Sequence, residues 1–483
     1  MMREYKRYDE YKDSGVEWIG TIPNEWDVER FRTLTKNIQN GKWGEEAQNN
    51  SDDIYCVRVA DYNREKNIVE DQEFTIRNLD KSSREELLLE KDDLLLEKSG
   101  GGDKQPVGFV AQYKSEKPAI YANFMAKIEP RKEYIKTDYL KHVNISIYQK
   151  REILKVINQT TGIQNLDTKR YLEIESPLPS KSEQQKIASF LDKKTAEIDE
   201  IINKKEILID HLEKYKKSVI TEAVTKGKLG DKYINEDGEL VDEIKMKDSG
   251  IEWIGEIPKF IDAVKIKRLT QIKRGASPRP IDNPIYFDDN GKYSWVRISD
   301  VTRSDDYLLE TEQTLSKLGA SKSVKMDEGD IFLSIAATVG KPIITKIKCC
   351  IHDGFVYFPE YNENKKFLFY IFKSEQPYRG LGKHGTQINL NTTIVGDIKI
   401  PYFKKSSQEK IANYLDQKTT QINNLINKTK QSTEKYKKYK RSLIFEAVTG
   451  KIDLRDYELE GGEELAEHNY SSETKRERLS AVD

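Results

Sequence analysis

The chain has 483 residues, enough for roughly two to four domains with ordinary hydrophobic cores. Its 81 lysines and arginines balance 82 aspartates and glutamates, so only local charge clusters can bear on a nucleic-acid partner. Three cysteines, Cys56, Cys349 and Cys350, exclude a disulfide framework and lack metal-site spacing, and no stretch reaches the roughly 18 apolar residues that span a bilayer. These features predict a cytoplasmic protein without membrane association.

The first predicted feature is an opening block that occurs twice. Lys12–Pro23 reads KDSGVEWIGTIP and Lys247–Pro258 reads KDSGIEWIGEIP, with ten of twelve positions identical. Shorter repeated motifs follow each copy of the block in the same order. Because the period of about 235 residues far exceeds that of a solenoid repeat, the pattern indicates tandem duplication of a whole unit.

The first body, residues 26–180, is predicted to mix helices and strands. Short apolar runs predict strands at 54–59, 94–96 and 107–110, and apolar spacing predicts a helix over 138–157. The segment 98–105 is a glycine-rich basic loop, and 158–165 is a loop rich in amides that can pair with adenine. The candidate DNA contacts of this body are Arg58, Lys98, Ser99, Lys104, Gln159, Thr160, Gln164 and Asn165.

Each body is followed by a closing block that predicts a long helix. Gln185–Thr225 aligns without gaps to Glu409–Thr449, with 20 of 41 residues identical. Ser182 with Gln185, and Ser406 with Glu409, fit the capping box of a helix start. Since no glycine or proline follows until Gly227 or Gly450, each helix is expected to have about 40 residues, or roughly 60 Å.

The second body, residues 260–404, is also predicted to be mixed. Strands are expected at 330–334 and 354–358, and a helix at 365–373. The loop 273–279 supplies glycine with basic residues, and the loop 384–389 is the counterpart of 158–165. The candidate DNA contacts here are Lys273, Arg274, Ser277, Arg279, Arg297, Thr386, Gln387 and Asn389.

The apolar residues of both long helices recur at three- and four-residue intervals, as in the seam of a coiled coil. The simplest partnership is between the two helices of one chain, although a single amphipathic helix on a core, or pairing between chains, remains open. The basic clusters 214–217 and 437–441 indicate either a solvated face or contact with phosphate or another subunit. The candidate interface residues are Ile187, Leu191, Ile198, Ile201, Leu208, Leu212, Ile411, Leu415, Ile422, Leu425 and Leu443.

No catalytic motif emerges from the sequence. There is no GxxxxGK[ST] phosphate loop, and the five histidines form no HExxH or Cys/His cluster. Asn283–Tyr286 approaches the Asn-Pro-Pro-Tyr motif of amino-methyltransferases, but Ile285 breaks it. His352 with Asp353 is interpreted as a loop pair. A binding role is therefore predicted, with no metal and no catalytic residue.

In these features the chain resembles the specificity subunit of type I restriction-modification systems. The resemblance is carried by both opening blocks and by the helix start EQQKIASFLD at 183–192, with its echo QEKIANYLD at 408–416. It covers nearly the whole chain up to about residue 455. It implies an α+β protein with two mixed α/β target-recognition domains in tandem and two long helices forming an antiparallel intramolecular coiled coil with pseudo-two-fold symmetry.

The domains expected from this resemblance are a first target-recognition domain (1–180), a central helix (181–228), a second target-recognition domain (229–404), a C-terminal helix (405–455) and a polar, disordered tail (456–483). Each recognition domain is expected to read one half of a bipartite, gapped site in double-stranded DNA. The helices are expected to set the gap and to dock two modification subunits, which two restriction subunits join. AdoMet, ATP and Mg belong to those partners, and none is expected on this chain.

Two rival functions remain open. The chain could be a coiled-coil scaffold that binds only protein, and DNA binding without sequence preference by the assembled complex would favour it. A stand-alone methyltransferase would bind AdoMet by itself, and the missing motifs argue against it.

Overall fold

The computed structural model describes residues 5–160, 162–378 and 390–459. The chain divides into two compact units, the first comprising residues 1–206 with 431–483 and the second residues 207–430. Each unit holds a mixed body together with parts of the two long helices, α5 (Lys181–Lys226) and α10 (Lys405–Val448). The mixed class and the two long helices expected from the sequence are confirmed.

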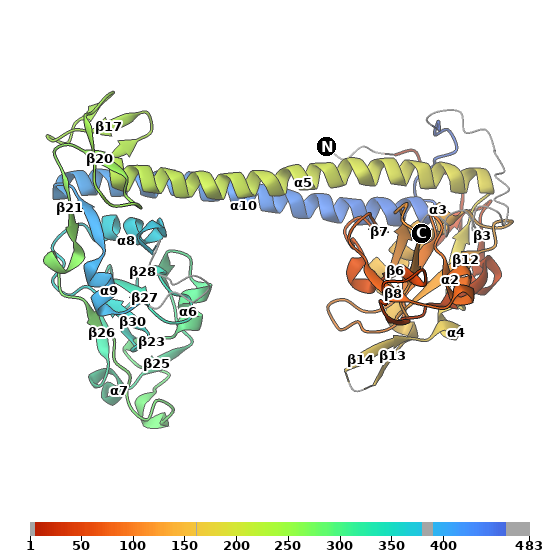
Figure 1. Ribbon diagram of the computed structural model, residues 1–483, viewed down its shortest axis with the longest axis horizontal. Helices are drawn as coiled ribbons and strands as arrows, with labels where there is room; N and C mark the ends of the chain where they lie inside the picture. The colour runs from red at the N-terminus through yellow and green to blue at the C-terminus, as the bar shows by residue number, and fades with distance from the viewer. Residues whose placement is uncertain (1–4, 161, 379–389, 460–483) are drawn as a thin grey trace. The chain divides into compact units, whose positions relative to one another are not determined.

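The body of the first unit contains a five-stranded and a four-stranded sheet (Figure 1). Buried apolar strands such as β9, with every residue covered, form its core. The five-stranded sheet runs β4 (Thr35–Asn40), β12 (Met125–Pro130), β9 (Leu94–Glu97), β10 (Val110–Tyr113), β7 (Ile68–Val69), and the four-stranded sheet runs β11 (Ala119–Tyr121), β6 (Asp53–Val57), β8 (Thr75–Asn78), β5 (Glu45–Glu46).

The described part of this unit also contains three two-stranded ribbons and four α-helices. The ribbons are β1 (Tyr11–Asp13) with β2 (Thr21–Pro23), β3 (Asp27–Arg30) with β15 (Glu175–Leu178), and β13 (Ile157–Thr160) with β14 (Ile163–Leu166). The helices are α1 (Phe31–Leu34), α2 (Lys81–Leu87), α3 (Thr137–Gln149) and α4 (Thr168–Tyr171). The helix expected over 138–157 ends at Gln149, because the chain turns at Arg151, whose φ of 62° is left-handed.

The second unit repeats the topology of the five-stranded sheet. Its order is β22 (Lys273–Arg274), β30 (Phe355–Tyr357), β27 (Ile331–Ser334), β28 (Pro342–Thr345), β24 (Tyr307–Leu308), matching the first unit strand for strand. The four-stranded sheet keeps three equivalent strands but adds its fourth at the opposite edge, in the order β25 (Gln313–Leu315), β23 (Tyr293–Val296), β29 (Cys349–Ile351), β26 (Val324–Met326).

The remaining elements of the second unit also follow the first. β21 (Asp262–Lys265) pairs with β31 (Lys399–Tyr402), and β19 (Met246–Asp248) pairs with β20 (Glu256–Pro258). A three-stranded sheet follows α5, comprising β16 (Lys228–Leu229), β17 (Lys232–Ile234) and β18 (Leu240–Val241). The helices are α6 (Ile298–Arg303), α7 (Lys317–Ser321), α8 (Lys365–Lys373) and α9 (Thr392–Asp397), of which α8 has the predicted bounds.

The long helices begin and end through local signals. α5 starts with a capping box two residues earlier than predicted: the Ser180 hydroxyl donates to Glu183 Oε2 at 2.8 Å and accepts from the Glu183 N–H at 3.3 Å. Ser182 and Ser406 lie inside the helices, so the capping assignments made for them are wrong. Gly227 and Gly450 follow the helices with φ of 64° and 71°, the left-handed conformation that terminates a helix.

The partners of α5 on α10 fall in reverse order along the chain. In the first unit, the Lys440 ammonium lies 2.7 Å from Asp199 and the Lys437 ammonium 3.1 Å from Glu206. In the second unit, Lys216 donates to Asn423 at 3.0 Å. Three lysines of the predicted basic clusters therefore hold the helices together, which reduces their availability to phosphate.

The predicted apolar seam is buried toward the helix ends and partly exposed near the middle. Ile187, Leu191, Ile198, Ile411, Leu415, Ile422 and Leu443 are buried as expected. Leu208 and Leu425 are instead 46% and 52% exposed, while Ile201 and Leu212 are half-buried. Ile202 and Ile426, one position further along, are buried in their place. An apolar stripe drifts around a helix with 3.6 residues per turn, so a strict heptad loses its register with length.

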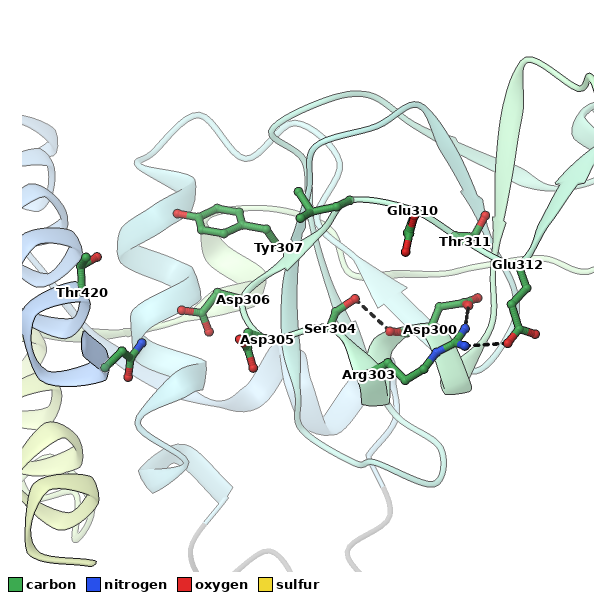
Figure 2. Close-up of a pocket in the computed structure, with 12 residues that line it drawn as sticks. Asp300, Arg303, Ser304, Asp305, Asp306, Tyr307, Glu310, Thr311, Glu312 and Thr420 are labelled. Carbon is green, nitrogen blue, oxygen red and sulfur yellow. Dashed lines mark hydrogen bonds and ion pairs between the residues drawn. The ribbon is translucent and has the colours of Figure 1, made fainter. Parts of the chain in front are cut away.

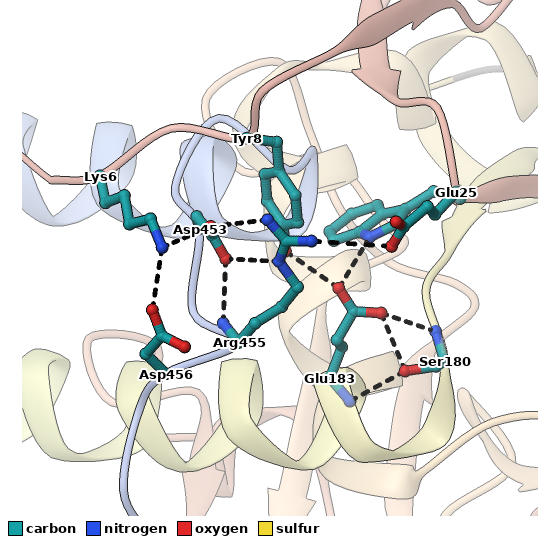
Figure 3. Close-up of polar contacts among 9 residues, drawn as sticks. Lys6, Tyr8, Glu25, Ser180, Glu183, Asp453, Arg455 and Asp456 are labelled. Atoms are coloured by element: carbon teal, nitrogen blue, oxygen red, sulfur yellow. Dashed lines mark hydrogen bonds and ion pairs between the residues drawn. The ribbon is translucent and has the colours of Figure 1, made fainter.

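In the first unit, the segment after α10 contacts the segment before β1 (Figure 3). Asp453, whose side chain is fully buried, accepts two hydrogen bonds from Arg455 at 3.0 Å, and Arg455 lies over the Tyr8 ring at 4.8 Å. Tyr8 in turn donates to Glu183 at the start of α5 at 3.1 Å. Residues before β1 and after α10 thus form one polar cluster at the start of α5.

A partly buried polar cluster joins α3 to α5. Asp192 of α5 accepts from the Lys141 ammonium at 2.6 Å and lies 2.8 Å from His142 Nε2, and the side chains of Lys141 and His142 are almost fully buried. Burial alone would raise the pKa of Asp192, but hydrogen bonds from His142 and Lys141 lower it. In the second unit, Asp416 of α10 accepts from Lys366 and Tyr370 of α8 in the same way.

We expect Asp192→Asn to lower the free energy of unfolding by about 1–3 kcal/mol, because it leaves the buried Lys141 ammonium without its counter-charge. The measurement is chemical denaturation of the full chain at neutral pH. Glu200→Gln, which removes an exposed carboxylate paired with Lys204 on the same helix, is the control and should change stability by less than about 0.5 kcal/mol. Equal effects of the two substitutions would contradict the anchoring role.

The same cluster predicts a pH dependence. Burial lowers the pKa of His142, so the unfolded chain takes up a proton there at a higher pH than the folded chain. This contribution to stability is present above the unfolded histidine pKa of about 6.5 and is lost as the pH falls through the folded value. His142→Gln should therefore reduce the loss of stability between neutral pH and about pH 5.5, measured by denaturant midpoints. An unchanged loss would contradict the assignment.

Candidate DNA-contact surface

Both bodies carry the same sharp glycine turn at one end of the five-stranded sheet. Gly41 follows β4, and a Cβ at this position would lie 2.2 Å from the Tyr121 carbonyl oxygen. Gly275 follows β22, and a Cβ there would lie 2.2 Å from the His352 carbonyl oxygen. Gly41 N–H donates to Met125 and Gly275 N–H to Phe355, at 3.0 and 2.9 Å. Only glycine permits this approach of two backbones, so the two bodies share one loop framework.

In the first unit this framework brings together predicted residues from separate segments. The Lys98 ammonium donates to the side-chain oxygen of Asn40, beside the glycine turn. The Ser99 hydroxyl donates to Asn165 on the β13–β14 ribbon at 2.6 Å. Burial lowers the pKa of Lys98, while the turn residue Phe124 is 54% exposed. Lys98, Ser99 and Asn165 therefore belong to one surface.

The amide-rich segment is a β-hairpin and not the expected loop (Figure 1). Gly162 at its turn has a left-handed φ of 86°. Gln159 and Asn165 are exposed on the strands, as a contact surface requires. Gln164 is buried, and its side-chain oxygen accepts from the Val107 N–H at 3.4 Å, so it supports the loop and does not face solvent. Thr160 lies in β13, next to the turn.

The other predicted residues of the first unit lie apart from this cluster. Arg58 donates to Asp61 at 3.0 Å and fixes the turn after β6. Lys104 is exposed and lines a recess of about 610 Å³ with Arg151 and Arg441. In the second unit, Arg297 is the counterpart of Arg58. It is exposed, and its backbone N–H donates to Asp300 at 2.8 Å.

In the second unit three predicted residues converge on Asp353. The Ser277 hydroxyl donates to Asp353 Oδ1 at 2.8 Å, an Arg279 guanidinium nitrogen donates to Oδ2 at 3.1 Å, and Arg274 Nε donates to its backbone carbonyl. The hydrogen bond from Ser277, reinforced by the Arg279 charge, lowers the pKa of Asp353. Lys273 is exposed on β22 beside this group. Thr386, Gln387 and Asn389 lie outside the described residues.

The position of Asp353 is set by the packing of its neighbour. The His352 ring lies 4.6 Å from Phe355 and 5.9 Å from Trp295, and its Nδ1 accepts from the Gly354 N–H at 2.8 Å. Burial lowers the pKa of His352, so the ring stays neutral near pH 7. This agrees with the interpretation of the pair as a loop feature. Asp353 and Asn40 were not among the predicted contacts, although both lie beside glycines in the sequence.

One recess of the second unit differs in charge from this surface. Figure 2 shows a recess of about 770 Å³ between the body and α10, where Asp305, Asp306 and Glu310 gather. Arg303 pairs there with Asp300 and Glu312, both at 2.7 Å. This negative surface repels phosphate.

Potential metal ligands are dispersed among residues 5–160, 162–378 and 390–459. No group of three or more potential metal ligands occurs there. Burial raises the pKa of Cys56 and Cys349 to about 12, which keeps both thiols protonated. Within the same residues, no helix is long and apolar enough to cross a membrane.

Comparison with known proteins gives a consistent family. The family described as type I restriction modification DNA specificity domain matches residues 23–211 and 258–435. The chain is 25% identical over 453 residues to the type I restriction enzyme MjaVIII specificity subunit of Methanocaldococcus jannaschii, covering 90% of this chain and 95% of that protein. It is also 25% identical to the StySPI specificity subunit of Salmonella potsdam, over 43% of this chain and 44% of that one.

Solved structures share the fold. A chain from a study of complex assembly and conformational transition in the type I R-M system superposes with a TM-score of 0.68, at 14% identity, over 89% of this chain and 99% of that one. The HsdS subunit from Thermoanaerobacter tengcongensis gives a TM-score of 0.51 at 15% identity, over 89% and 98%. With its two family matches, one in each unit, the chain belongs to the type I restriction-modification DNA specificity family, whose members are non-catalytic subunits.

Proposed function

We propose that each body reads one half of a bipartite, gapped site in double-stranded DNA for a type I restriction-modification complex. The observation that supports this most is the shared glycine framework with different exposed side chains. Lys98, Ser99 and Asn165 gather in the first unit, and Arg274, Ser277 and Arg279 in the second. A constant frame with different hydrogen-bonding groups suits two readers of different base sequences.

The long helices are proposed to form an antiparallel intramolecular coiled coil with pseudo-two-fold symmetry, and thereby to set the gap. The reversed pairing order within each unit supports this arrangement. Asp199 pairs with Lys440 and Glu206 with Lys437 in the first unit, and Glu213 pairs with Lys430 and Lys216 with Asn423 in the second. A rigid spacer restricts two recognition modules to half-sites at one fixed separation on the duplex.

The same helices are proposed to dock two modification subunits. Ile207, Leu208, Tyr215 and Leu425 each expose between 46% and 52% of their surface on helical segments of the second unit. Exposed apolar side chains on a long helix favour a partner helix. Two restriction subunits would complete the assembly. We assign AdoMet, ATP and Mg to those partners, and expect the complex to act in the cytoplasm.

The direct test is sequencing of adenine methylation in cells that carry this chain with its modification subunits. We expect one bipartite motif with a constant gap, and loss of that methylation when the chain is deleted. A gel shift with the purified complex should show at least about a 1,000-fold preference for that motif over unrelated DNA. DNA binding without sequence preference would favour the protein-only scaffold, and AdoMet binding by the isolated chain would favour a methyltransferase.

Docking is tested separately with Leu425→Lys. We expect about a 10-fold or greater loss of affinity for the modification subunit, because a charge replaces an apolar contact, with little change in the unfolding midpoint because Leu425 is exposed. Leu318→Lys, a similarly exposed leucine on the short helix α7, is the matched control and should bind normally. Both affinities are measured without DNA, and equal losses would contradict a helix-specific interface.

A further inference from the structure

The group around Asp353 has a composition that simple phosphate binding does not explain. A carboxylate next to DNA is repelled by phosphate, yet Asp353 lies among Lys273, Arg274 and Arg279 and keeps 38% of its side chain exposed. Its two carboxylate oxygens are occupied by different donors, Ser277 and Arg279. A carboxylate held in this way orients the arginine.

Arg279 is fixed at both ends while its guanidinium stays accessible. The Arg279 carbonyl accepts from the Tyr286 hydroxyl at 2.9 Å, and one terminal nitrogen donates to Asp353 at 3.1 Å. The side chain is nevertheless 71% exposed. Because a guanidinium has five N–H donors in one plane, a single bond to Asp353 leaves others able to bind two acceptors at once.

We propose that Arg279, oriented by Asp353, reads a guanine in the half-site bound by the second unit. In the major groove, guanine presents O6 and N7 as two acceptors on one edge, which a planar arginine pairs bidentately, whereas adenine presents one donor and one acceptor. This inference rests on the proposed function and assigns one base to one residue. Asp353 is the positioning residue, and Ser277 holds its second oxygen.

The first unit has different chemistry at the equivalent positions. The turn that carries Asp353 corresponds to Asn123 and Phe124, and Arg274 corresponds to Asn40, whose oxygen accepts from Lys98. No carboxylate–arginine pair lies at this turn in the described part of the first unit. Substitution of Arg279 should therefore affect one half-site and leave the other unchanged.

The test is adenine-methylation sequencing of cells carrying the full chain, or its Arg279→Lys or Asp353→Asn variant, with the modification subunits. We expect Arg279→Lys to relax one guanine position in one half-site by about 10- to 100-fold, since lysine keeps the charge but loses the fork. Asp353→Asn should relax the same position to a smaller extent. Lys259→Gln, an exposed lysine beyond β20, is the control and should leave the motif unchanged. Thermal unfolding of each purified variant checks that the fold is retained.

The possible outcomes separate the inference from the function on which it rests. An unchanged motif in Arg279→Lys, relaxation at an A·T pair, or a uniform loss across both half-sites would overturn the guanine assignment and leave the proposed function standing. A wild-type motif without guanine in either half-site would also overturn it. Absence of any motif in the wild-type complex would overturn the proposed function itself.

Discussion

The attachment of each long helix to a recognition body is the interaction on which the rest of the structure depends. Near the start of each helix, a fully covered glutamine bonds the neighbouring backbone. Gln184 accepts from the Lys136 N–H at 2.8 Å, and Gln408 accepts from the Asn364 N–H at 3.1 Å. These N–H groups belong to the N-cap residues of α3 and α8, so one amide side chain satisfies a helix terminus and joins two helices.

A second attachment lies two turns further along and depends on charge. Asp192 and Asp416 occupy equivalent positions of the duplicated helix, yet their partners differ: Lys141 and His142 in one unit, Lys366 and Tyr370 in the other. The bodies have diverged while keeping a donor pair for the same carboxylate. Because a buried charge without a partner is costly, this requirement limits how the contact surface between body and helix can change. The exposed loops at the glycine turns are not subject to this requirement.

The sequence was sufficient to predict what duplication and periodicity encode. Uninterrupted runs of helix-forming residues predict the lengths of α5 and α10 and the bounds of α8. A glycine after each long helix, Gly227 or Gly450, predicts its end. It was insufficient where tertiary contacts decide. The capping box at Ser180 depends on residues far away in the sequence, because Trp26 and Tyr8 both donate hydrogen bonds to its Glu183 carboxylate. Leu208 and Leu425 are exposed because the apolar stripe drifts around the helix and, after many turns, no longer follows the heptad spacing.

The candidate site shows the same division. Composition identified Lys98, Ser99 and Asn165 as polar loop residues, and the structure brings them together through a bridge between distant segments. Composition could not separate Gln164, which faces inward, from Asn165 beside it, because alternation in a strand sends neighbours to opposite faces. Composition does not point to Asp353, since an acidic side chain by itself repels the phosphates of DNA. Its importance is visible only when Arg279 and Ser277 are seen to share it, because orientation of a donor is a property of the group and not of any one residue.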